Sequence, residues 1–176
     1  MDPTDTPDAI DGALGSPWQA ARAHSRYLDN LLLNRPDIAS WLGEHVAQPL
    51  TAGEMRDFLD AAAPHDDAGV KRVLRRLRQR VMATLIVRDL GGMAPLSEVV
   101  ETMTQLADVT TNFALDFAHR QLCELYGEPL DSQGRPQRLM VIGMGKLGGR
   151  ELNVSSDVDF IFVYPEEGYT AGGRCI

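Results

Sequence analysis

Two aspartates separated by one residue carry the clearest chemical signal in the sequence. Asp157 and Asp159 come directly before the apolar run 160–164, which has the composition of a β-strand. Because side chains alternate between the two faces of a strand, a strand that begins here directs both carboxylates to the same side. Paired carboxylates in this arrangement suit Mg²⁺, which prefers oxygen ligands together with substrate phosphates.

A pair of glycines, Gly148 and Gly149, lies a short distance before the aspartates. Glycine lets the backbone come close to a phosphate chain, and the backbone N–H groups can then face phosphate oxygens. A metal ion and a phosphate group held side by side predict in-line attack at a phosphorus atom, with the metal polarising the phosphate oxygens.

The glycines also match two other nucleotide-binding patterns, and neither fits the residues around them. Residues 143–148 follow G-x-G-x-x-G, the turn of dinucleotide-binding folds. Those folds need a helix long enough to cross over to a parallel strand, whereas residues 153–156 interrupt a helix and a β-rich run starts near Val158. A P-loop requires a hydroxyl residue after its lysine, but Lys146 is followed by Leu147. The combination of paired glycines and paired aspartates therefore favours the metal-and-phosphate interpretation.

Helices are expected to make up most of the chain before these motifs. The 3.6-residue spacing of apolar side chains and the capping signals predict them. Asp67 is the expected cap of the fourth helix, and residues 127–136 are expected to be a linker. Residues 138–142 predict a buried strand, and the tail 168–176 shows no strand or helix signal. The predicted helices cover residues 17–35, 37–46, a short segment opened by a capping box at 51–54, 70–90 and 95–126.

Basic residues crowd the first half of the predicted helix 70–90. One interpretation is a solvated face whose aliphatic stems lie over neighbouring residues. The other is a cationic surface that faces nucleotide phosphates or an acidic partner protein. The first interpretation is preferred on frequency alone. The residues concerned are Lys71, Arg72, Arg75, Arg76, Arg78 and Arg80.

Composition limits the classes of partner. The 176 residues carry a net charge of −8, so the molecule as a whole does not attract nucleic acid or an anionic membrane. Two cysteines without metal-ligand spacing argue against a disulfide framework and fit a reducing compartment. No apolar run reaches the length of roughly 18 residues that a membrane span requires. We expect a cytoplasmic protein that binds neither membranes nor nucleic acid.

Residues 143–164, GMGKLGGRELNVSSDVDFIFVY, resemble a known family. Paired glycines before Asp-hydrophobic-Asp on a strand look like the nucleotidyltransferase superfamily that includes DNA polymerase β. The complete sequence of this segment, together with an early Ser-Arg-Tyr segment at 25–27, is similar to that of the bacterial bifunctional glutamine synthetase adenylyltransferase/adenylyl-removing enzymes. The resemblance implies two nucleotidyltransferase domains in one long polypeptide. One transfers AMP from ATP to a tyrosine of glutamine synthetase, and the other removes it by phosphorolysis, releasing ADP. A PII nitrogen-signalling protein and glutamine set the balance.

The resemblance also assigns roles to individual residues. By position the motif matches the N-terminal, adenylyl-removing domain. Asp157 and Asp159 would then ligate Mg²⁺, and Gly148 and Gly149 would hold the phosphates of the nucleotide substrate. The further candidates for phosphate contact are Ser156 and Lys146, the second of which could equally be a surface charge.

The expected fold class is mostly α with a small α/β part. It comprises a disordered tail (1–15), a helical region (16–134) and the first two strands of an incomplete nucleotidyltransferase domain (135–176). The superfamily's third carboxylate has no counterpart here, so a truncated chain with little activity of its own is expected. The alternative is a helical protein-interaction fragment without catalysis.

Overall fold

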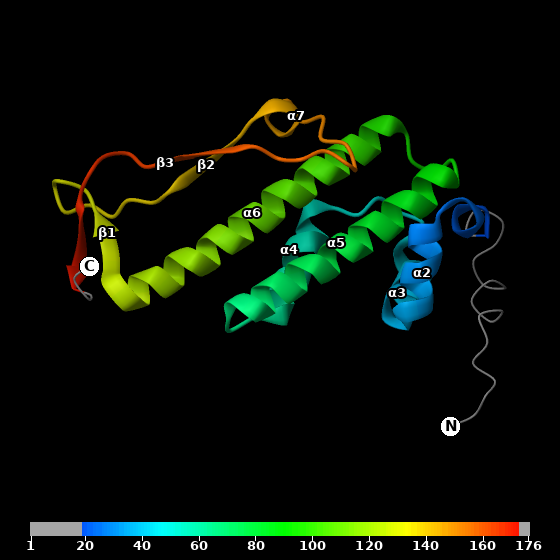
Figure 1. The fold of residues 1–176 in the computed structure, drawn as a ribbon, viewed down its shortest axis with the longest axis horizontal. Helices are drawn as coiled ribbons and strands as arrows, with labels where there is room; N and C mark the ends of the chain where they lie inside the picture. The colour runs from blue at the N-terminus through cyan, green and yellow to red at the C-terminus, as the bar shows by residue number, and fades with distance from the viewer. Residues whose placement is uncertain (1–18, 173–176) are drawn as a thin grey trace, which may run out of the picture.

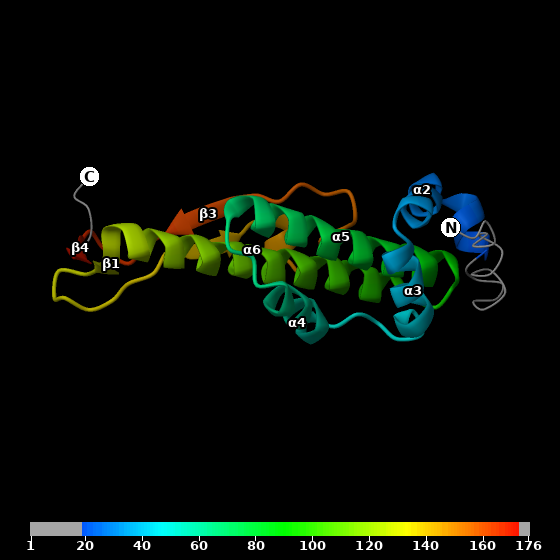
Figure 2. The ribbon, with the colours of Figure 1, turned by 90° about the horizontal axis from the view of Figure 1, so that it is seen from below.

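The computed structural model describes residues 19–172, and most of them are helical, as the sequence predicts. The long helices α5 (Asp67–Leu90) and α6 (Leu96–Tyr126) run side by side, and a thin β ribbon follows one side of α6 (Figure 1). Helices α2 and α3 lie at one end of this pair, and the view in Figure 2 shows α4 beneath it. Residues 19–24 are also helical. The other helices are α2 (Arg26–Asn34), α3 (Pro36–His45), α4 (Ala52–Ala62), α5 (Asp67–Leu90), α6 (Leu96–Tyr126) and the single turn α7 (Gly145–Gly148).

The first predicted helix is divided in two, which corrects the expectation of one helix over residues 17–35. The break falls at Ser25, which has extended backbone angles and whose hydroxyl accepts a hydrogen bond from Leu28 N at 3.2 Å. Serine satisfies an otherwise unpaired N–H in this way, so it starts a new helix as readily as it continues an old one. The start of the predicted helix, residues 17–18, and the predicted tail 1–15 lie outside the described residues.

The remaining helix boundaries follow the capping signals closely. Thr51 and Glu54 form the predicted capping box at the start of α4. Helix α5 begins at Asp67, three residues before the predicted range 70–90. Its cap is Asp66 and not Asp67, because the Asp66 side chain accepts a hydrogen bond from Gly69 N at 2.7 Å. Helix α6 is the longest element, and its 31 residues span roughly 46 Å.

Two apolar clusters hold the helices together. One joins α2 and α3 to the second half of α5 around Leu28, Ile38 and Val87. The other joins α4, α5 and α6 and includes two side chains from the β region, Leu147 and Leu152. The β region is therefore anchored in the same core as the helices. No helix among residues 19–172 is long and apolar enough to cross a membrane.

In the described part of the chain, four short strands form two separate antiparallel pairs. Strand β2 (Met140–Gly143) pairs with β3 (Phe160–Val163), and β1 (Gly127–Leu130) pairs with β4 (Tyr169–Gly172). The prediction of a linker at 127–136 and of a tail without strands is therefore wrong for β1 and β4. Local sequence gave no sign of this pairing, because each strand is stabilised by a partner about 40 residues away, a pairing that local patterns do not contain.

The predicted strand over residues 138–142 is confirmed at Met140–Gly143, but the prediction that it is buried is wrong. Met140 and Ile142 are each 49% exposed. Within residues 19–172 this sheet has only two strands, and the face that carries Met140 and Ile142 is left largely in solvent. On the other face Phe160 packs against the main core cluster.

Candidate functional site

The glycine-rich turn packs directly onto strand β2. The chain leaves β2 at Gly143, makes the single helical turn α7, and returns beside the strand. A methyl group at Gly148 would lie 2.6 Å from the carbonyl oxygen of Gly143, and one at Gly143 would lie 2.8 Å from the side chain of Leu147. Glycine at these two positions therefore allows the turn to contact the strand and Leu147 to reach the core.

Gly149 has no such steric requirement. A methyl group there would meet Glu151 and the Gly145 carbonyl at 3.5 Å, which is ordinary contact, and its φ of −79° suits any residue. The amides of Gly148 and Gly149 donate within the turn, to Met144 O at 3.2 Å and Gly145 O at 2.9 Å. In this conformation the two glycines offer a bare backbone surface, and their N–H groups are already engaged.

Three contacts fix the segment after the glycines against α6. Leu152 is buried, and its N–H donates to the hydroxyl of Thr104 at 3.4 Å. Arg150, with a left-handed φ of 57°, donates to Glu101 at 2.5 Å and lies 3.6 Å from Asp108. The long helix thus determines where the glycine turn ends and where the aspartate segment begins.

These contacts also affect ionisation. Hydrogen bonds from Gln105 first, and then from Arg150, lower the pKa of Glu101. The hydrogen bond to Glu101 raises the pKa of Arg150. Both shifts favour the charged forms, so the pair stays ionised where the loop meets the helix.

The two aspartates lie beside the glycine turn because of the β2–β3 pairing. Met144 N donates to Asp159 O at 2.9 Å, which continues the ladder beyond β3 and brings residues 157–159 next to α7. Both aspartates are exposed, and neither side chain has a hydrogen bond or ion pair with any residue in the range 19–172. Two unpartnered carboxylates are available to an external cation.

The other predicted residues differ in their surroundings. Ser156 is half-buried, and its hydroxyl donates to Asn153 Oδ1 at 2.6 Å, within a turn that precedes the aspartates. Lys146 is exposed on α7. The structure therefore places all six predicted residues on one continuous strand–turn–strand segment, with Ser156 occupied by a local bond.

The donor set is suited to a hard cation held partly by other groups. Within the described part of the chain, no three His, Cys, Asp or Glu side chains gather to form a metal cage. Mg²⁺ usually keeps several waters and is held by one or two carboxylates plus substrate phosphates. The two free aspartates meet that requirement, and they fit Mg²⁺ better than a metal that needs a complete protein cage.

Two residues that position the site were not found from sequence. Thr104 is buried at 1% exposure and supports Leu152, and Arg150 ties the loop to α6. The adjacency of Arg150 to the glycine pair was a signal that could have identified it. Thr104 had no such signal, since a threonine within a long helix is unremarkable until its partner is known.

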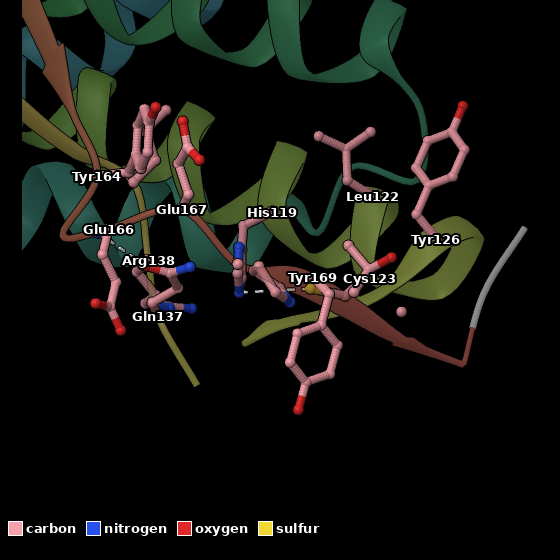
Figure 3. Close-up of a pocket in the computed structure, with 15 residues that line it drawn as sticks. His119, Leu122, Cys123, Tyr126, Gln137, Arg138, Tyr164, Glu166, Glu167 and Tyr169 are labelled. Atoms are coloured by element: carbon pink, nitrogen blue, oxygen red, sulfur yellow. Dashed lines mark hydrogen bonds between the residues drawn. The ribbon is translucent and has the colours of Figure 1, made fainter. Parts of the chain in front are cut away.

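A separate hollow of about 770 Å³ lies at the other end of α6 and contains none of the six predicted residues. Figure 3 shows Tyr126 from α6, Tyr164 from the segment just after β3, and Tyr169 from β4 around this hollow. Cys123 Sγ lies 3.5 Å from His119 Nε2 on the helix face that lines it. It is a mainly apolar surface and has no part in the candidate site.

Comparisons with known proteins agree with the motif. A family model described as glutamate-ammonia ligase adenylyltransferase matches residues 18–175. A curated relative from Aromatoleum aromaticum is 47% identical over 92% of this chain and 18% of its own length. One from Nitrosomonas eutropha is 46% identical over 87% of this chain and 17% of its own. One from Thioalkalivibrio sulfidiphilus is 43% identical over 99% of this chain and 19% of its own.

All three relatives are named bifunctional glutamine synthetase adenylyltransferase/adenylyl-removing enzyme. The chain spans less than one fifth of their length. The family match nevertheless begins before α2, ends beyond β4, and includes both the glycine turn and the aspartate pair. The chain belongs to the glutamate-ammonia ligase adenylyltransferase family.

Proposed function

We propose that this chain contributes to nucleotidyl transfer that regulates glutamine synthetase, and specifically to removal of AMP from its adenylylated tyrosine. The observation that carries the proposal is the pair of free, exposed aspartates held beside a glycine turn by the β2–β3 ladder. Family membership and the names of the relatives support the substrate. The order of elements, a helical region followed by one such motif, supports the removing half.

The proposed reaction is a phosphorolysis. An oxygen of inorganic phosphate attacks the adenylyl phosphorus, the bond from that phosphorus to the tyrosine oxygen breaks, and the tyrosine oxygen takes up a proton. The products are ADP and unmodified tyrosine. Mg²⁺ bound by Asp157 and Asp159 would polarise the phosphate oxygens and offset their charge.

The turn residues have distinct parts in this proposal. Gly149 has room for a methyl group and no backbone need for glycine, which supports a role in letting a phosphate approach closely. Gly148 shapes the same turn through its contact with Gly143. Lys146 is an exposed cation on that turn and is available to phosphate. Ser156 holds the turn before the aspartates through Asn153.

The regulatory context is also a proposal. A PII nitrogen-signalling protein and glutamine would control the reaction, as the family resemblance implies, and the enzyme would act in the cytoplasm. The small number of cysteines, two in 176 residues, supports a reducing compartment. We further propose that the chain alone has little activity, because the described site supplies two carboxylates and no third.

A hybrid enzyme tests the assignment. Residues 18–175 would replace the matching segment of the full-length Aromatoleum aromaticum relative, and release of ADP from adenylylated glutamine synthetase would be measured with phosphate and Mg²⁺. We expect Asp157→Asn or Asp159→Asn to lower AMP removal by at least about 100-fold, because the electrostatic stabilisation of the transition state is lost. The isolated 176-residue chain serves as a further arm and should release little ADP.

Asp89→Asn is the matched control, because Asp89 is an exposed aspartate on α5 and far along the chain from the motif. Asp89→Asn should leave both AMP removal and AMP addition by the hybrid enzyme unchanged. If the aspartate variants keep AMP removal but lose AMP addition, the assignment to the removing half is wrong. If they keep both activities, these residues are not metal ligands and the proposed site is wrong.

A further inference from the structure

A basic hollow lies on the first half of α5, apart from the glycine turn and the aspartates. Its volume is about 410 Å³. Four guanidinium groups and one carboxylate line it, so the lining carries a formal charge of +3 on a chain whose net charge is −8. The lining residues are Arg35, Asp37, Arg72, Arg75, Arg76 and Gln79.

Internal contacts fix one side of the hollow. Arg35 donates two hydrogen bonds to Asp37, both at 2.8 Å, and a third to Gln79 Oε1 at 2.8 Å. Arg76 lies 3.5 Å from the same Asp37 carboxylate. The junction of α2 and α3 is thereby held against α5, so one wall of the hollow is already ordered.

The other side keeps its charge. Arg72 and Arg75 have no hydrogen bond or ion pair with any residue in the range 19–172. Residues 71–80 contain six basic residues and no acidic one. Like charges three and four positions apart on a helix repel each other, as Arg72 does with Arg75 and Arg76. These positive charges therefore contribute little to folding and are free to bind an anion.

Arg80 shows that the basic residues of α5 do not all behave alike. Its guanidinium lies over the rings of Trp41 and Phe58, at 5.1 and 4.4 Å from their centroids. Arg80 thus belongs to the packing between helices, through its guanidinium group. Arg72 and Arg75 instead line an open hollow and have no partner among residues 19–172.

We propose that this hollow is a binding site for a phosphate group. Guanidinium groups present planar pairs of N–H donors that match phosphate oxygens, and several of them can share one phosphate or diphosphate. Asp37 already fills the position between Arg35 and Arg76 that a carboxylate from a partner would take. A compact phosphate therefore fits the remaining donors better than an acidic peptide does. Among residues 19–172 no aromatic side chain lines the hollow, so these residues offer a nucleotide base nothing to stack on.

Titration calorimetry of the 176-residue chain with inorganic pyrophosphate tests the proposal. EDTA would be present, so that any metal-dependent site at Asp157 and Asp159 contributes nothing. Ionic strength would be held constant with sodium chloride. We expect Arg72→Gln/Arg75→Gln to weaken binding at least about tenfold, because two charge-assisted hydrogen-bonding groups are lost. We expect Asp37→Asn to strengthen binding, because a competing carboxylate is removed.

The control variant is Lys71→Gln/Arg78→Gln, which removes the same charge from the same helix at two exposed positions outside the hollow. It should change affinity by less than about twofold, with circular dichroism confirming that each variant is folded. Equal losses of affinity in the two double variants would show that binding depends only on the overall positive potential of the helix, and would overturn the proposal. Absence of binding by the unmodified chain would do the same.

Two further ligands identify what is recognised. ADP should bind as tightly as pyrophosphate, because only the phosphates find partners. If ADP binds more than about tenfold more tightly than pyrophosphate, the site recognises the nucleoside as well as the phosphates, and the proposal is overturned. A hexaglutamate peptide should bind more weakly than pyrophosphate. If it binds more tightly, the surface serves an acidic protein segment and the phosphate assignment is wrong.

Discussion

The ion pair between Arg88 and Glu98 connects three helices and allows a stringent test of the fold. Arg88 is 4% exposed, and its guanidinium contacts both oxygens of Glu98, at 2.6 and 3.0 Å. A third donor reaches the carbonyl of Val46 at 2.9 Å, just after α3. The pair therefore joins the end of α5 to the start of α6 and to the end of α3.

Replacing Arg88 by Met keeps most of the side-chain volume and leaves the Glu98 carboxylate and the Val46 carbonyl without their donors. Breaking one side of a buried pair costs about 3–5 kcal/mol. The Glu98 side chain keeps 13% exposure, so water reaches it partly and we expect the lower end, about 3 kcal/mol. At roughly 2–4 °C per kcal/mol for a chain of this size, the melting temperature should fall by about 6–12 °C.

Urea denaturation of Arg88→Met, Glu98→Leu and the double variant measures this effect. The double variant should recover at least about 1.5 kcal/mol of the Arg88→Met loss, because it leaves no uncompensated charge. Arg78→Met is the control, since Arg78 is exposed on the same helix, and it should change stability by less than about 0.5 kcal/mol. A loss below about 1 kcal/mol for Arg88→Met, or additive effects in the double variant, would refute this account of the helix junction.

Two other predictions concern the glycine turn and the basic hollow. Gly148→Ala should cost about 1–3 kcal/mol in urea denaturation, because its methyl group would lie 2.6 Å from Gly143 O, whereas Gly149→Ala should cost under about 0.5 kcal/mol. Equal costs at the two positions would contradict the geometry of the turn. The hydrogen bond from Arg35 lowers the pKa of Asp37 to about 2 from its usual 3.8, so its stabilising effect is present above pH 3.8 and lost as the pH falls towards 2. In Asp37→Asn the melting temperature should therefore depend less on pH over that interval. An unchanged dependence on pH would count against the Arg35–Asp37 ion pair.

Much of the helical architecture was predictable, because helices depend on patterns within a few residues. The apolar stripe of α5, including Val73, Leu77 and Val81, is buried as its 3.6-residue spacing predicts. The capping box at Thr51 and the glycine stop after Leu90 set their boundaries correctly. The division at Ser25 was missed, because a serine within a continuous apolar pattern does not show which of two conformations it adopts.

The candidate site was predictable to a similar degree. Asp157, Asp159 and the glycine pair were identified from their types and spacing, and the structure brings them together through β2–β3 pairing. Their functional roles stay predictions. The contribution of Thr104 and Arg150 was invisible, since each acts through a partner that is about 48 or 49 residues away along the chain.

The sequence by itself determined the helices, the chemical identity of the strand–turn–strand segment and its family. Local periodicity, capping groups and a motif of closely spaced residues contain that information. Only the tertiary structure decided that β1 pairs with β4, that Arg88 is buried against Glu98, and that Arg35 completes a basic hollow with Arg72 and Arg75. Each of these features is formed by groups that are far apart in the sequence. The contacts between such groups stabilise it, and a local sequence pattern contains no information about them.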